Sequence, residues 1–252
     1  MGDRRKEKRG QVTIFIIIAM VIIALGFLAY AFYPKVKSTL SLQEKNPQGY
    51  IQECIQKDLQ DTLTLISSQG GSVNPTNFIL YNKSKVEYLC YTNENLAKLC
   101  VVQRPVLQTH IKSELKSVLE NKINTCFESL KKNYETKGYV VTWEKGNRTV
   151  ELLPKKTLLR LTDKVVLTKE NSQVYNEFVV MINNNLYELT AIADSIVAWE
   201  SEYGDADPIV YMTYYPDLKV EKMVTSDGKV YILTNRDTKE IFQFSVRGFV
   251  LI

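Results

Sequence analysis

The chain has very little histidine, with one residue, His110, among 252. Histidine is the usual general base of serine and cysteine hydrolases, so a triad of that type would depend on this single side chain. No G-x-S-x-G motif accompanies it, and it stands near the start of an expected helix with a polar face. We therefore expect no catalytic role for His110 and predict that the protein is not an enzyme.

Several other binding signatures are missing from the sequence. It contains no H-E-x-x-H zinc motif, no Walker phosphate loop and no G-x-G-x-x-G nucleotide motif. The four cysteines are spaced by 36, 10 and 26 positions, without the close C-x-x-C pair that is typical of zinc sites. The sequence thus predicts neither a metal site nor a cofactor.

One dense acidic group remains as a candidate for chemistry. It consists of Glu200, Glu202, Asp205 and Asp207, directly before Pro208. Carboxylate oxygens are the ligands that Ca²⁺ prefers, although the EF-hand pattern is absent here. We interpret the group as the polar end of a helix. An exported enzyme with an unrecognised site is the alternative that it supports.

Charged residues are absent from positions 11–34. Ile14 to Tyr33 form 20 consecutive residues in which only Gly26 is not strongly apolar. A helix of this length rises about 30 Å, which matches the hydrocarbon core of a bilayer. The sequence therefore predicts a transmembrane helix over residues 11–33, with the lipid bilayer as its partner.

The residues before this segment set its expected orientation. Positions 1–10 carry five basic side chains and two acidic ones. Because positive charge stays on the cytoplasmic side of a membrane, we expect residues 1–10 in the cytoplasm and the C-terminal domain outside the cell membrane. A cleaved secretory signal is an alternative, since Ala29-Tyr30-Ala31 has the small-x-small spacing of a signal peptidase site.

The junction Lys8-Arg9-Gly10-Gln11, followed at once by the apolar segment, resembles the class III signal of archaeal type IV pilins and archaellins. The resemblance implies cleavage between Gly10 and Gln11, after which the helix would self-assemble into a filament core. Many pilins carry Glu at the fifth residue after the cut, where this chain has Phe15. The chain also resembles uncharacterised archaeal surface proteins that begin with this segment, which implies exposure at the cell surface.

Beyond the apolar segment the chain is close to neutral. Residues 11–252 carry 27 basic and 26 acidic side chains. A basic face for nucleic acid is therefore not expected. We predict a linker over residues 34–48 and an extracytoplasmic domain over residues 49–252, with a possible split near Lys137-Gly138.

Periodicity predicts an α+β domain of amphipathic helices packed on antiparallel sheets. Apolar residues at helical spacing predict helices over Gly49–Ser68, Val106–Tyr134 and about Ser172–Tyr203. β-branched and aromatic runs predict the strands Asn77–Tyr81, Val86–Cys90, Tyr139–Trp143, Thr149–Leu153, Val165–Thr168, Ile209–Tyr215, Leu218–Thr225, Lys229–Thr234 and Ile241–Val246. Gly70-Gly71 is expected to end the first helix, and Ser226-Asp227-Gly228 to form a primed hairpin turn.

An even number of cysteines in an exported domain favours two disulfides, with three possible connectivities. Cys54 and Cys126 each lie on the apolar stripe of a predicted helix. Packing the two stripes together would bring the sulfurs into one interface, so we predict a Cys54–Cys126 bond. Cys90–Cys100 would then close the loop after the small hairpin. Four reduced, buried cysteines are the alternative.

Two further surface features are candidates for function. Asn82-Lys83-Ser84 and Asn147-Arg148-Thr149 are glycosylation sequons in predicted turns, and chance occurrence is as good an explanation. In the expected strand over residues 209–215, alternation places Tyr211 and Tyr215 on one face and Tyr214 on the other. Sheet packing is the favoured role of these tyrosines, and contact with a partner or a sugar is the alternative.

These observations predict a single-pass, membrane-anchored cell-surface protein. Its ectodomain would have a structural, adhesive or partner-binding role, with a partner that the sequence does not name. A pilin-like filament subunit cleaved after Gly10 is the first alternative, and the exported enzyme is the second.

Overall fold

The structure is a computed structural model that describes residues 16–24, 46–94 and 98–248. The chain divides into two compact units, Met1–Asn46 and Pro47–Ile252. This division falls inside the linker expected over residues 34–48. The second unit has a continuous apolar core with residues from both sides of Lys137-Gly138.

The prediction of a membrane-spanning N-terminal helix is wrong for the fold that the structure describes. In the expected range 11–33 the described helix covers residues 16–24. Among the described residues, no helix combines the length and the apolar character needed to cross a membrane. Residues 1–15 and 25–45 lie outside the described part of the chain.

The second unit mixes helices and strands, as the sequence predicts. Its helices are α2 (Pro47–Ser68), α3 (Leu107–Glu135), α4 (Leu186–Tyr203) and α5 (Pro208–Tyr214). Its strands are β1 (Phe78–Tyr81), β2 (Ser84–Tyr91), β3 (Val101–Val102), β4 (Val140–Glu144), β5 (Arg148–Leu153), β6 (Lys156–Leu161), β7 (Lys164–Thr168), β8 (Ser172–Tyr175), β9 (Phe178–Asn183), β10 (Leu218–Thr225), β11 (Gly228–Asn235) and β12 (Ile241–Arg247).

Within the described residues the strands form one large sheet and two small ones. The large sheet has the order β1-β2-β12-β11-β10, with β3 paired to β2. The small sheets have the orders β4-β7-β8 and β5-β6-β9. The pairs are antiparallel, as expected, except that β12 runs parallel to β2. This parallel pair joins segments about 155 residues apart, which only a long connection allows.

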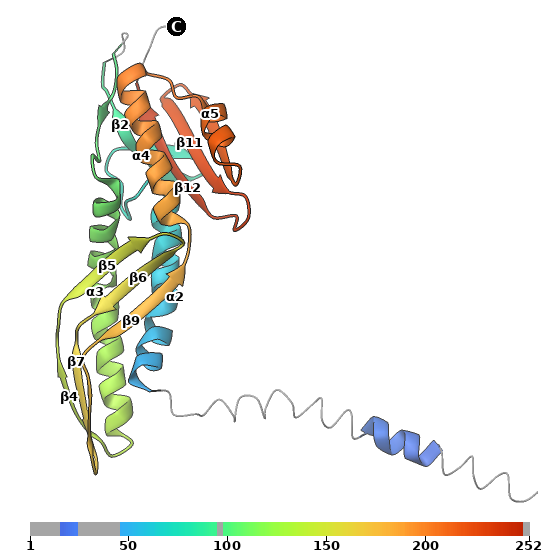
Figure 1. The fold of residues 1–252 in the computed structure, drawn as a ribbon, viewed down its shortest axis with the longest axis vertical. Coiled ribbons are helices and arrows are strands. Elements are labelled where there is room, and N and C mark those ends of the chain that lie inside the picture. Colours follow the sequence, from blue (N-terminus) through green and yellow to red (C-terminus); the bar gives the residue numbers. More distant parts are fainter. Residues whose placement is uncertain (1–15, 25–45, 95–97, 249–252) are drawn as a thin grey trace, which may run out of the picture. The chain divides into compact units, whose positions relative to one another are not determined.

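The helices α2 and α3 lie side by side, and their facing apolar stripes form a large part of the core (Figure 1). The buried stripe of α2 contains Ile51, Ile55, Leu59, Leu63 and Ile66. The facing stripe of α3 contains Ile111, Leu115, Leu119, Ile123, Phe127 and Leu130. Sheet β5-β6-β9 packs across these helices, while α4 covers the large sheet near β11 and β12.

All four cysteines form disulfides, with the pairing predicted above. The Cys54–Cys126 bond joins α2 to α3 with a Cα–Cα distance of 5.9 Å. The Cys90–Cys100 bond, with a Cα–Cα distance of 5.3 Å, joins β2 to the segment before β3. The apolar stripes therefore brought the first pair into one interface, as the helix spacing indicated.

The long helix expected from Ser172 to Tyr203 is wrong in its first half. Residues 172–183 form β8 and β9, and the helix begins at Leu186. Along β9 burial alternates, so that Phe178, Val180 and Ile182 face the core. The spacing of four between Phe178 and Ile182 fits a helix, but it also fits two repeats of a strand. Strand β6 was not predicted, and it provides the partner of β9.

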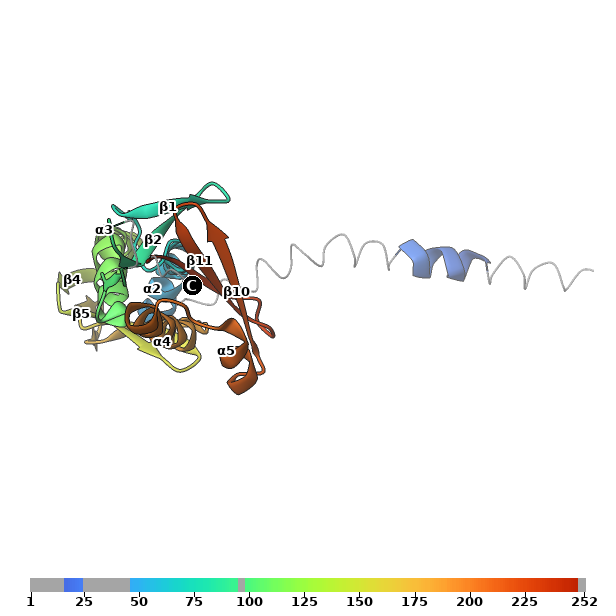
Figure 2. The same cartoon turned by 90° about the horizontal axis from the view of Figure 1, so that it is seen from above.

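The strand expected over Ile209–Tyr215 is also wrong, because residues 208–214 form helix α5. Asp207 caps this helix, since its carboxylate accepts a hydrogen bond of 2.8 Å from the backbone N–H of Ile209. Pro208 occupies the first turn, where proline is favoured. In Figure 2 α5 lies beside β10, next to α4.

The hairpin at Ser226-Asp227-Gly228 is present between β10 and β11, where Thr225 pairs with Gly228. Only Gly228 has a positive φ, of 140°, so the turn is not of the expected primed type. A Cβ at Gly228 would lie 2.4 Å from the carbonyl oxygen of Val246. The position therefore requires glycine because the backbone of β12 approaches it closely.

Candidate functional site

A hollow of about 630 Å³ lies between α4 and α5, and we refer to it as the α4–α5 groove. Its volume is within the range of roughly 300–1,000 Å³ that is usual for ligand clefts. Aromatic side chains dominate its lining, with one indole and three phenol rings. The lining residues are Ala191, Ile192, Ser195, Trp199, Asp205, Asp207, Val210, Tyr211, Tyr214 and Tyr215.

The groove exists because α4 turns one face to the core and another to α5. Leu189, Ala193 and Ile196 are buried on the core face. Ser195 and Trp199, four residues apart, share the opposite side of the helix and remain exposed. Helix α5 contributes no buried residue and forms the second wall.

The aromatic rings of the groove are unusually open to solvent. Trp199 is 49% exposed and Tyr214 is 77% exposed. The indole nitrogen of Trp199 donates a hydrogen bond of 3.1 Å to the carbonyl of Asp205. The same ring packs against Tyr203 with a centroid distance of 4.5 Å. The indole is thus held in place on one side while much of its surface stays accessible.

Hydroxyl groups surround these rings. The Ser195 hydroxyl lies 3.3 Å from the phenol oxygen of Tyr211, and either group can donate. Within the described part of the chain, the hydroxyls of Tyr214 and Tyr215 form no hydrogen bond. They remain able both to donate and to accept a hydrogen bond.

Two carboxylates of the acidic group at the end of α4, those of Glu200 and Asp205, are paired with lysines from the large sheet. The Lys229 ammonium lies 2.8 Å from Glu200 and 2.7 Å from Asp205, and Lys222 lies 3.0 Å from Asp205. Partial burial raises the pKa of Asp205, but the hydrogen bonds from Lys229 and Lys222 outweigh it and lower the net pKa. The Tyr231 hydroxyl donates to Glu200, and burial raises the pKa of that phenol.

This arrangement argues against the Ca²⁺ site that the spacing suggested. Glu200 points into the core, Asp207 caps α5, and Glu202 hydrogen bonds to Tyr203, which raises the pKa of the Tyr203 hydroxyl. The four carboxylates therefore serve different partners instead of converging on one point. The described residues contain no group of His, Cys, Asp and Glu side chains placed to hold a metal ion.

His110 belongs to a row of hydrogen-bonded polar side chains that do not line the groove. Its Nε2 atom is 2.7 Å from the Ser72 hydroxyl, and Ser72 in turn donates to Glu87. Arg104 donates to the other oxygen of Glu87 at 2.6 Å. Burial, followed by the charge of Arg104, lowers the pKa of His110 below its ordinary value, which favours the neutral ring at pH 7. Because the Ser72 hydroxyl donates to Glu87, the tautomer with the proton on Nε2 satisfies the contact between His110 and Ser72.

A serine nucleophile would need to give its proton to the histidine, but here the Ser72 hydroxyl donates its proton to Glu87 and not to His110. The proton of Ser72 goes to Glu87, and the side chain of Ser72 is buried, with the residue 3% exposed. A substrate has no access to a hydroxyl in that position. Ser72, Glu87 and His110 therefore form hydrogen bonds that hold together the segment after α2, strand β2 and helix α3.

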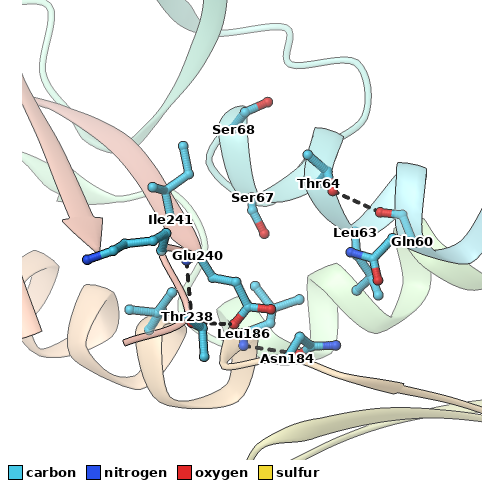
Figure 3. A pocket seen from close by; sticks show the side chains of 12 residues that line it. Gln60, Leu63, Thr64, Ser67, Ser68, Asn184, Leu186, Thr238, Glu240 and Ile241 are labelled. Carbon is cyan, nitrogen blue, oxygen red and sulfur yellow. Dashed lines mark hydrogen bonds between the residues drawn. The ribbon is translucent and has the colours of Figure 1, made fainter. Parts of the chain in front are cut away.

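A second hollow, of about 270 Å³, lies where α2 meets the start of α4 and the turn between β11 and β12 (Figure 3). Its polar groups bond mainly to each other. Glu240 accepts from the backbone and side chain of Asn185 and from Thr238. Thr64 donates to the carbonyl of Gln60. The crevice offers few unengaged polar groups, so we regard it as structural.

The remaining predicted site residues are separated in the structure. Asn82 lies exposed in the β1–β2 turn and Asn147 lies exposed just before β5. Gly10 and Gln11, the expected processing site, are outside the described residues. The expected contact of the N-terminal helix with lipid or with further copies stays a prediction.

Sequence reasoning missed Trp199 as a functional residue. The signal was present, because Trp199 falls outside the apolar stripe that Ala193 and Ile196 define. A large aromatic residue off the core face of a helix indicates either a second contact or an exposed ring. The tyrosines were noticed, but the wrong secondary structure placed Tyr211 and Tyr214 on opposite faces.

No protein-family model, curated protein or solved structure matches this chain. The chain is therefore described by its fold and its groove. It is an α+β protein with two disulfides and an open aromatic groove between two helices.

Proposed function

We propose that this chain is an exported, non-enzymatic binding protein whose partner occupies the α4–α5 groove. The observation that carries the proposal is the exposure of Trp199, Tyr214 and Tyr215 around one hollow. Aromatic side chains bury large areas when a partner covers them, and tyrosine and tryptophan are enriched at binding surfaces for that reason. Three such rings left open at one place are typical of a site that awaits its ligand.

The disulfides support an extracytoplasmic location. Cys54, Cys126, Cys90 and Cys100 are all oxidised, and the described residues contain no free cysteine. Disulfides persist in secreted and surface proteins and are rare in the reducing cytosol. The near-neutral charge of the chain beyond residue 10 agrees with a protein partner or a glycan better than with nucleic acid.

The polar clusters support binding in preference to catalysis. The only histidine is tied to Ser72, whose proton is engaged by Glu87. The carboxylates of Glu200 and Asp205 are engaged by lysines. Neither cluster leaves a proton donor and acceptor facing each other across an open site, which acid–base chemistry requires.

The test compares two variants of the full-length protein. One carries Trp199→Ala and Tyr214→Ala in the groove. The matched control carries Leu80→Ala and Val140→Ala, whose side chains are 69% and 70% exposed and lie on strands outside the groove. All four positions are at least partly exposed, so both variants should fold, and denaturant unfolding of each variant measures the stability lost with the Trp199 hydrogen bond and ring contact.

Each fluorescently labelled protein is added to intact cells from which its own gene has been deleted, and bound label is measured by flow cytometry. We expect the groove variant to lose at least about tenfold in apparent affinity, as substitution of central aromatic residues does at other interfaces, while the control binds normally. Equal binding by the two variants would refute the role of the groove.

A further inference from the structure

We infer that the α4–α5 groove binds an uncharged oligosaccharide. The inference rests on the proposed binding role of the groove and names the chemical class of its ligand. Three properties of the lining carry it: the open aromatic rings, the unengaged hydroxyls and the carboxylates that already have partners.

The rings match the apolar faces of sugars. A pyranose presents C–H groups on its flat faces, and these pack on the negative face of an aromatic ring. Trp199 offers a broad surface of this kind, since its indole N–H is already bonded to Asp205 and its ring is half exposed. Tyr214 and Tyr215 add two further rings from the other wall.

The hydroxyls match the edges of sugars. Each sugar hydroxyl both donates and accepts, so it pairs best with groups that do the same. The phenols of Tyr214 and Tyr215 are of this type and are not engaged within the described residues. The Ser195–Tyr211 pair adds a third such point at the groove.

The carboxylates in the groove already have partners, which argues against ions as ligands. Of the lining residues only Asp205 and Asp207 are charged. Asp205 is paired with Lys222 and Lys229, and Asp207 is engaged by the first turn of α5. An anion finds no free Lys or Arg among the described lining residues, and a cation finds no carboxylate without a partner.

The length of the hollow favours a chain of sugars over a single ring. A neighbouring hollow of about 400 Å³ shares Ala191, Ile192, Tyr214 and Tyr215 with the groove and continues toward Tyr187 and Asp217. The two together form an extended depression along α4, and Tyr214 and Tyr215 line both parts of it. The second part adds the charged residues Lys155, Glu188 and Asp217 to the lining, and Glu188 accepts a hydrogen bond from the backbone N–H of Lys155.

Trp199 provides a direct readout for the test. The chain has two tryptophans, and the other, Trp143, stacks on Phe127 and donates to Asp163 in the opposite part of the second unit. The full-length protein and its Trp199→Phe variant are titrated with cellotriose, maltotriose, mannotriose and triacetylchitotriose while tryptophan emission is recorded. Calorimetry on the same samples measures binding independently of the fluorophore.

We expect at least one trisaccharide to give a saturable change of emission that the Trp199→Phe variant lacks. Affinity should fall by at least about tenfold in a Tyr214→Ala, Tyr215→Ala variant, and less in the corresponding Phe variants, which keep the rings. The Leu80→Ala, Val140→Ala control should bind as the native protein does.

Two results would overturn the inference about the sugar ligand without refuting the proposed binding function of the groove. Absence of saturable binding by all four trisaccharides in both measurements would exclude this ligand class. Binding of tetramethylammonium or of a lysine-rich peptide instead would assign the groove to a cation by a cation–π contact. In either case a groove variant that still loses binding to cells would leave the binding role of the groove intact.

Discussion

The ammonium of Lys229 on β11 lies 2.8 Å from the fully buried carboxylate of Glu200 on α4. The same ammonium reaches the carbonyl of Gly204 and the carboxylate of Asp205. These bonds fix the last turn of α4 and the start of the connection to α5 on the large sheet. The ion pair between Lys229 and Glu200, on the core side of α4, therefore positions the part of α4 that carries Trp199.

Removal of the Lys229 ammonium should strongly destabilise the protein. A Lys229→Met variant leaves the carboxylate of Glu200 buried without its counter-charge, which typically costs about 3–5 kcal/mol. Unfolding by urea, followed by circular dichroism, measures the loss. Lys219→Met is the matched control, because Lys219 pairs with Glu221 at the surface and should lose less than about 1 kcal/mol. Equal losses in the two variants would contradict the role of the buried pair.

The two disulfides should differ in their contribution to stability. Cys54–Cys126 spans 72 positions and Cys90–Cys100 spans 10. On the chain-entropy model, loops of these lengths give about 4 and about 3 kcal/mol respectively. Cys→Ala replacement of each pair, followed by denaturant unfolding, should therefore affect the α2–α3 bond more. A larger effect at Cys90–Cys100 would indicate that strain or packing, and not loop length, decides the difference.

The buried position of His110 should make stability depend on pH. Burial lowers the pKa of His110 below its ordinary value of 6.5, so the unfolded chain binds the proton more readily than the folded one. The stability that neutral His110 contributes is present above about pH 6.5 and is lost as the pH falls through the lower folded value. His110→Gln, which can still donate to Ser72, should flatten the pH dependence of the unfolding free energy between pH 7 and 5. An unchanged slope would assign the dependence to other groups.

Asp194 on α4 should weaken the folded state at neutral pH. Burial raises its pKa to about 6, and the described residues provide it with neither a hydrogen bond nor an ion pair. The penalty is fully present above pH 6 and disappears as the pH falls toward the ordinary value of 3.8.

Asp194→Asn should therefore raise the unfolding free energy at pH 7 by about 1 kcal/mol, after allowance for the half-exposed position of the side chain. The gain should vanish near pH 4. A loss of stability at pH 7 would show that the carboxylate has a favourable partner.

Local sequence patterns predicted the elements that have a long regular repeat or a short connecting turn. The stripes of α2 and α3 repeat at helical spacing over many turns, and this was enough to pair Cys54 with Cys126. The hairpin β10–β11 followed from two strand-like runs around an Asp-Gly turn. In each case the signal is a spacing between nearby residues, which is the same in any tertiary context.

The secondary structure of short elements was predicted wrongly where one residue spacing fits both the helix period and the strand period. Phe178 and Ile182 fit a helix face and a strand face equally, and only pairing with β6 decides between them. In α5, Asp207 and Pro208 form a local start signal for a helix that our sequence analysis did not use, and the aromatic and β-branched residues after them led to the prediction of a strand. The prediction of a membrane-spanning N-terminal helix failed because none of the helices in the described part of the chain is long and apolar enough to cross a membrane.

The sequence alone thus determined the α+β class, the two core helices, the oxidised cysteines and the lack of familiar catalytic motifs. The tertiary structure decided which faces stay open and which charges are cancelled. Trp199 and Tyr214 form one groove, and Lys229 cancels Glu200, only because separate helices and strands are packed together. Such contacts depend on the sum of many weak interactions across the whole core, and no local spacing encodes that sum.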